Sequence, residues 1–155
     1  MTHLSLICLG KLKESYWREA EAEYLKRLRP WAKIEIKELK EESFNEKDQS
    51  EKIKKEEAEK ILAAWPKSGA VIVLDESGKK MDSVSLAKTW EQLSNQNNIT
   101  IVIGGPLGLD KSVLARADLV LSLSPLTFTH QLARVVLWEQ IYRALMIVKG
   151  KKYHY

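Results

Sequence analysis

The stretch IVIGGPLGLD, residues 101–110, carries the clearest fold signal in the chain. It begins as an apolar run of the kind that forms a buried strand, and the run ends in a glycine-rich bend. Asp110, directly after the bend, is a residue type that commonly caps a helix. The bend therefore has three interpretations: it holds a phosphate, it holds a cofactor without one, or it is a turn with no ligand.

Two similar apolar runs flank this one along the chain. They are AVIVLD at 70–75 and LVLSLS at 119–124. The central apolar run begins two residues before the quoted stretch, as ITIVIGG at 99–105. Helical segments such as VSLAKTWEQL at 84–93 lie between them. Strands that are apolar on both faces and linked by helices are typical of a parallel sheet covered on both sides. The sequence thus predicts an α/β fold.

The rest of the chain extends this pattern. HLSLICLG at 3–10 predicts a first strand, and the helical periodicity after it stops at Pro30. AKIEIKEL at 32–39 alternates apolar and charged residues, as a strand with one wet face does. The charged run at 40–60 becomes helical in its second half. The last helix, at about 129–149, is apolar on most of its surface, and we expect it to line a subunit contact.

Composition limits the class of protein. The 155 residues fit one domain, residues 1–155, and 25 basic against 21 acidic side chains give a net charge of +4. A local basic excess lies in the C-terminal tail KGKKYHY at 149–155, so nucleic acid is a permitted partner.

Several site types are disfavoured by the sequence. Cys8 is the single cysteine, which excludes an intrachain disulfide and a cysteine-based zinc site. His3, His130 and His154 have no metal-ligand spacing, so no metal is expected. The segment MTHLSLICLGKLKE at 1–14 lacks a basic region and a long apolar run. We therefore expect a cytoplasmic protein without a membrane segment.

Ligands of open parallel sheets bind beyond the carboxyl ends of the strands. Here those ends are Leu74, Gly104 and Leu123, and a turn-prone loop follows each of them. The sequence therefore predicts a pocket where the three loops DESGKK, GGPLGLD and SPLTFTH converge.

The glycine bend does not match the phosphate-binding motifs. A P-loop needs Lys and Ser or Thr after its last glycine, whereas Leu109 follows Gly108. The dinucleotide-binding fingerprint needs another glycine spacing, and Pro106 removes an amide donor. A bend that brings backbone close to a neutral or cationic nucleoside through Gly104 and Gly105 remains, as does a turn with no ligand. A side chain at Gly105 is expected to fill such a pocket.

The last helix and the tail carry polar groups at regular spacing. His130 and Arg134 share one helix face, and Glu139 and Arg143 share another, where a surface ion pair is the simpler interpretation. His130 is either an acid–base group or a structural hydrogen-bonding residue. Lysines among aromatic rings in the tail are what base stacking and phosphate binding require, although short termini often fray.

Four segments in order resemble the ribosomal RNA large subunit methyltransferase H family of the SPOUT class. They are VIVLDESGK, IVIGGPLGL, LSLSPLTFTHQLARVVLWEQIYRA and the ending YHY, and the resemblance spans nearly the whole chain. It implies a three-layer α/β/α SPOUT fold whose C-terminal part forms a trefoil knot.

The resemblance also implies S-adenosylmethionine as the methyl donor. Its contacts, carried over by position, are the three strand ends and the loops after them: Leu74, Gly104, Gly105, Leu123, Ser124, Pro125, Leu126, Thr127 and Phe128. The bend would then hold a nucleoside that carries no phosphate.

The implied acceptor is N3 of a pseudouridine in the helix-69 loop of 23S rRNA, on the assembled ribosome. An imide nitrogen must lose its proton to attack, so a group has to accept the proton or stabilise the anion. The candidates are His154 and Arg143, with Glu139 orienting Arg143. RNA binding is assigned to six residues: His130, Arg134, Lys151, Lys152, Tyr153 and Tyr155. A homodimer packed through the last helix is implied, with one subunit's tail completing the other's site.

The chain departs from the family pattern at Thr129, where the family has proline, and at Tyr155, where it commonly has a basic residue. We expect a small loop adjustment at the first and a weaker phosphate contact at the second. Two other functions stay open: a ribosome- or RNA-binding protein of the same fold without turnover, and a nucleotide-dependent enzyme of the dinucleotide-binding type.

Overall fold

The computed structural model describes residues 1–43, 45 and 49–155. Its centre is a parallel sheet of five strands in the order β2-β1-β4-β3-β5. The strands are β1 Thr2–Leu9, β2 Ala32–Leu39, β3 Ala70–Lys80, β4 Asn98–Ile103 and β5 Leu119–Ser122. The parallel α/β prediction is confirmed, as are strands at all five predicted places.

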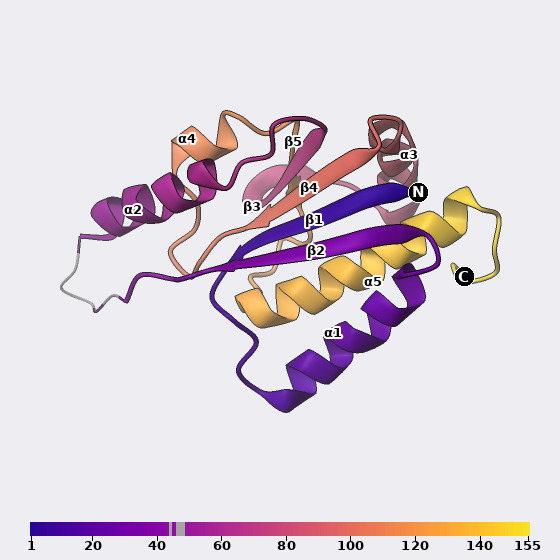
Figure 1. Ribbon diagram of the computed structural model, residues 1–155, viewed down its shortest axis with the longest axis horizontal. Coiled ribbons are helices and arrows are strands. Elements are labelled where there is room, and N and C mark those ends of the chain that lie inside the picture. The colour runs from indigo at the N-terminus through magenta and orange to yellow at the C-terminus, as the bar shows by residue number, and fades with distance from the viewer. Residues whose placement is uncertain (44, 46–48) are drawn as a thin grey trace.

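Helices cover both faces of this sheet and give three layers (Figure 1). One face is covered by α1 Ser15–Leu28, α3 Ser83–Ser94 and α5 His130–Val148. The other is covered by α2 Ser50–Ala63 and the short α4 Lys111–Leu114. The predicted α/β/α arrangement is therefore confirmed, whereas the trefoil knot stays a prediction.

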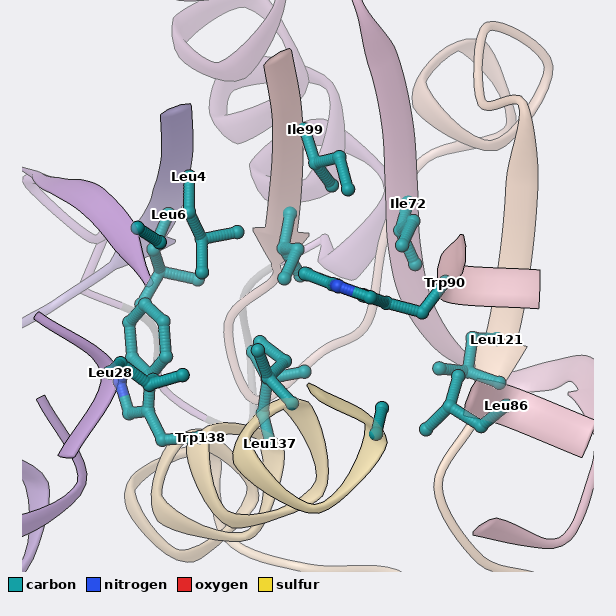
Figure 2. Packing of buried hydrophobic residues seen from close by; sticks show 14 of the residues in the cluster. Leu4, Leu6, Leu28, Ile72, Leu86, Trp90, Ile99, Leu121, Leu137 and Trp138 are labelled. Atoms are coloured by element: carbon teal, nitrogen blue, oxygen red, sulfur yellow. The ribbon is translucent and has the colours of Figure 1, made fainter. Parts of the chain in front are cut away.

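Alternation along the strands explains why both faces need a cover. Leu4 and Leu6 of β1 point into the larger core beneath α1, α3 and α5, while Ile7 points to the face beneath α2. Trp138 of α5 is fully buried in the larger core, close to Leu6 (Figure 2). β2 is one of the two edge strands, and its exposed alternate residues confirm the predicted wet face.

β3 is longer than the apolar run that predicts it. After Leu74 the chain bulges and then pairs with β5 a second time, Lys79 with Leu121 and Lys80 with Ser122. Gly78 makes this approach possible, since a Cβ there would lie 2.6 Å from the carbonyl carbon of Leu121. The expectation of a plain turn-prone loop after residue 74 is therefore wrong.

No helix in the described part of the chain is long and apolar enough to cross a membrane, and this includes the 19-residue α5.

Candidate functional site

A cavity of about 590 Å³ opens where β4 and β5 end and where β3 bulges after Leu74. It is lined by eight of the nine residues expected to contact the donor: Leu74, Gly104, Gly105, Leu123, Ser124, Leu126, Thr127 and Phe128. Pro125 instead faces a neighbouring, smaller hollow with Met81 and Asp82. The structure thus brings the three predicted segments together, the first as the bulged part of β3 and the other two as loops, and their contact with a cofactor stays a prediction.

The glycine bend forms one wall of this cavity. The amide of Gly108, which has a φ of +84°, donates to the carbonyl of Gly105 at 3.1 Å and closes a tight turn. Asp110 then caps α4 by accepting from the amide of Ser112 at 3.0 Å, which confirms its predicted role. A Cβ on Gly104 would lie 2.7 Å from the side chain of Leu109. The bend is therefore packed tightly against Leu109, which also lines the cavity.

Gly105 does not behave as expected from sequence. A Cβ at this position would first meet the carboxylate of Glu57, at 3.2 Å from Oε2. The expectation that a side chain at Gly105 simply fills the pocket is corrected. The Cβ would point toward Glu57 of α2, which does not line the pocket.

The loop after β5 is shaped by its own hydroxyl groups. The hydroxyl of Ser124 accepts from the amide of Leu126 at 2.9 Å, and the hydroxyl of Ser122 donates to the carbonyl of Ser124 at 3.1 Å. Thr129 caps α5 by accepting from the amide of Leu132 at 3.4 Å. Thr129 therefore starts α5 as an ordinary N-cap residue.

The cavity has the properties that a cationic nucleoside requires. Its volume is that of a small-molecule site, and its walls are mainly apolar with exposed loop backbone. Asp75 and Glu76 line it, whereas no Lys or Arg is among its described lining residues. S-adenosylmethionine fits such a site by size and charge, and a pyrophosphate does not.

Arg134 lies inside the protein and not on an RNA-facing surface. Only 5% of it is exposed, and its guanidinium pairs with Glu21 and Glu38. Glu21 also accepts from the indole Nε1 of Trp138 at 2.8 Å. The assignment of Arg134 to phosphate binding is therefore wrong, since the same contacts that bury the charge also use its donors.

This ion network also holds the single cysteine. The Arg134 Nη1 lies 3.4 Å from Sγ of Cys8. Burial, opposed in part by the charge of Arg134, raises the pKa of the Cys8 thiol to about 11. Cys8 therefore stays a protonated, unreactive core residue.

The three catalytic candidates form a cluster at the C-terminal part of α5. Arg143 donates from Nε to Glu139 Oε1 at 3.0 Å, and its Nη1 lies 3.4 Å from Nδ1 of His154. The hydrogen bond to Glu139 raises the pKa of Arg143 above its usual value. The structure thus pairs Glu139 with Arg143 in the orienting arrangement that was expected, and it places a fixed positive charge beside His154.

Tyr153 belongs to the same cluster. Its hydroxyl donates to Glu139 at 3.2 Å, its ring packs edge-on against Tyr142, and Arg143 lies 4.7 Å from the ring centre. Burial raises the pKa of its hydroxyl. In this chain Tyr153 is therefore held on α5 and is not a free stacking platform.

The other residues assigned to RNA binding lie at the surface. His130 lines the mouth of the cavity at the start of α5. Lys151, Lys152 and Tyr155 are exposed, as RNA contacts need to be. In the described residues no group of three or more His, Cys, Asp or Glu side chains could hold a metal ion.

The fold and this site define the class of protein. A family model described as "Predicted SPOUT methyltransferase" matches residues 2–154. Among solved structures, a probable methylase family protein from Haemophilus influenzae superposes with a TM-score of 0.56, over 99% of this chain and 70% of that one. At 15% identity this likeness concerns the fold alone.

Two relatives narrow the class. Proteins called "Ribosomal RNA large subunit methyltransferase H" are 44% identical in Halothermothrix orenii and 43% identical in Carboxydothermus hydrogenoformans. Each match covers 97% of this chain and 98% of the relative. The chain therefore belongs to the ribosomal RNA large subunit methyltransferase H family of SPOUT methyltransferases.

Proposed function

We propose that this protein transfers a methyl group from S-adenosylmethionine to N3 of a pseudouridine in the helix-69 loop of 23S rRNA, on assembled ribosomes in the cytoplasm. Family membership supports methyl transfer to large-subunit ribosomal RNA. The cavity at the strand ends is the observation that carries the choice of donor. Its acidic and apolar lining suits a sulfonium and disfavours the anionic cofactors of dinucleotide-binding enzymes.

S-adenosylmethionine supplies a methyl group on a positively charged sulfur, which is electrophilic without further activation. The protein's task is then to hold donor and acceptor close and aligned. Backbone of the loops after Leu74, Gly104 and Leu123 binds the adenosyl group and shields it from water.

Arg143 and His154 act on the acceptor. A guanidinium can only donate, so its contact with Nδ1 leaves the His154 ring proton on Nε2. His154 then donates a hydrogen bond to an oxygen beside N3, and Arg143 supplies positive charge. Both stabilise the imide anion that forms when N3 gives its proton to a solvent water molecule, and this anion then takes the methyl group as the bond from that methyl group to the sulfur breaks. Lys151, Lys152 and His130 hold phosphate, and Tyr155 stacks on a base.

A homodimer completes the site. None of Glu139, Arg143, Tyr153 and His154 lines the cavity of its own chain. Glu139 lies nine residues beyond His130 on α5, which is about 13 Å along the helix axis. The partner's C-terminal cluster therefore has to reach this chain's cavity. The exposed Leu132 near the cavity provides apolar surface for the contact.

The test is transfer of a radiolabelled methyl group from S-adenosylmethionine to ribosomes that lack the modification, followed by mapping of the labelled nucleotide. Label at N3 of the pseudouridine in the helix-69 loop is the expected result. Label elsewhere would contradict the acceptor. Tight ribosome binding without any label would favour an RNA-binding protein that has lost turnover.

A further inference from the structure

Glu57 is a buried carboxylate that the proposed reaction does not use. It lies in the middle of α2 with 3% of its surface exposed. Its Oε1 accepts from the amide of Glu42 at 3.3 Å, and its Oε2 has no hydrogen-bond partner within the described residues. A buried carboxylate with a missing partner costs free energy, so its position calls for a compensating group.

Gly105 separates this carboxylate from the cavity. A Cβ on Gly105 would lie 3.2 Å from Oε2 and 3.3 Å from Oε1 of Glu57, so the carboxylate lies on the side of Gly105 where a side chain would be. Gly105 itself lines the cavity. The Glu57 carboxylate therefore lies directly next to a residue of the cavity wall.

The carboxylates of the cavity lining add negative charge near Glu57. Asp75 and Glu76 line the cavity, and its described lining contains no Lys or Arg. Burial raises the pKa of Glu57, opposed in part by the amide of Glu42 and the charge of Lys60. A cation in the cavity would stabilise the ionised form of Glu57, whereas a neutral ligand would not.

We infer that Glu57 makes the cavity sensitive to the charge of its ligand, favouring the cationic donor S-adenosylmethionine over its uncharged thioether product, S-adenosylhomocysteine. The inference rests on the proposed function for the identity of the donor. Glu57 acts through Gly105 and the field in the cavity, and it is a specificity-determining residue that touches no reacting atom. Its effect is to strengthen binding of the cationic donor, and this added attraction is absent for the product once the methyl group has left.

The experiment compares the affinities of the full-length protein for both compounds by isothermal titration calorimetry. Glu57→Gln keeps the shape of the side chain and removes its charge. We expect it to weaken binding of S-adenosylmethionine about tenfold, the effect of one charge several ångströms away in a protein interior, and to change binding of S-adenosylhomocysteine less than about twofold. Glu59→Gln removes a charge at an exposed position of the same helix and should leave both affinities unchanged.

The outcomes separate this inference from the function on which it rests. If Glu57→Gln weakened the binding of both compounds equally, Glu57 would have a packing role and the inference would be overturned. Unchanged binding of both compounds, by a Glu57→Gln protein that melts at or above the wild-type temperature, would also overturn it. Failure of the wild-type protein to bind S-adenosylmethionine at all would contradict the proposed function itself.

Discussion

At the scale of single residues, two buried charged side chains lie on the apolar faces of helices. Ile53, Glu57 and Ile61 follow one another at a spacing of four, so an acid sits where the helix packs on the sheet. Arg134 lies in the same way one turn before the buried Trp138. This spacing was visible in the sequence. Which partner each charge would find was not, because the partners lie far away along the chain.

The Arg134 network gives a prediction on stability. Arg134→Ala leaves Glu21 buried without its charge partner, and we expect a loss of about 3 kcal/mol in the free energy of unfolding, measured by urea titration. Arg27→Ala breaks an exposed pair with Glu23 and should cost less than about 1 kcal/mol. A variant of Arg134 with wild-type stability and weakened ribosome binding would restore its assignment to phosphate contact.

Glu57 gives a prediction on pH. Burial raises its folded-state pKa above the ordinary 4.5, with contributions from Glu41 and Glu42 in the same direction and from Lys60 in the other. The protonated form thus favours the folded state, and this stability is lost as the pH rises through the folded-state pKa.

We therefore expect the wild-type protein to lose stability relative to Glu57→Gln as the pH rises from the ordinary pKa of 4.5 through the raised folded-state pKa. Thermal unfolding of both proteins across this range measures the difference, with Glu59→Gln as a control that should follow the wild type. Parallel profiles of wild type and Glu57→Gln would show that Glu57 does not titrate abnormally.

At the scale of elements, the strands were predictable because their apolar runs are short and bounded by turn residues. The extension of β3 was not, because DESGKK at 75–80 has the composition of a loop. Its second pairing with β5 depends on a backbone contact at Gly78, and propensity carries no information about such a contact.

Gly78 should accordingly be intolerant of substitution. In Gly78→Ala the new Cβ would lie within 3 Å of the backbone of both Leu121 and Ser122, so β5 must shift. We expect a loss of about 2 kcal/mol in unfolding free energy and weaker donor binding, because Leu123 follows directly. Lys79→Ala, at the exposed neighbouring position, should change neither quantity. A wild-type melting temperature for Gly78→Ala would rule out the tight approach.

At the scale of the whole molecule, a parallel α/β sheet with its site at the strand ends follows from sequence pattern and general rules of topology. The strand order follows less directly, because periodicity carries no information on which strands are neighbours. The separation between the cavity and the C-terminal cluster was apparent only in three dimensions. It makes the dimer a requirement of the proposed chemistry, since each half of the site belongs to a different end of α5.

Deleting residues 151–155 removes Tyr153 and His154 and leaves the cavity intact. We expect this truncated protein to bind S-adenosylmethionine within about twofold of the wild type and to lose methyl transfer. Gly104→Val should keep the C-terminal tail and lose donor binding, because the new side chain must fit against Leu109 at the cavity wall. Circular dichroism and thermal melting establish that both variants are folded.

Mixing these two inactive proteins tests whether each active site is built from both subunits. In a heterodimer, the intact cavity of the truncated chain meets the intact tail of its Gly104→Val partner. Random exchange of subunits should then restore about a quarter of the wild-type methyl transfer, because half of the dimers are mixed and each has one working site. Activity that stays at the level of the separate variants, in a mixture shown to contain heterodimers, would contradict a site shared between subunits.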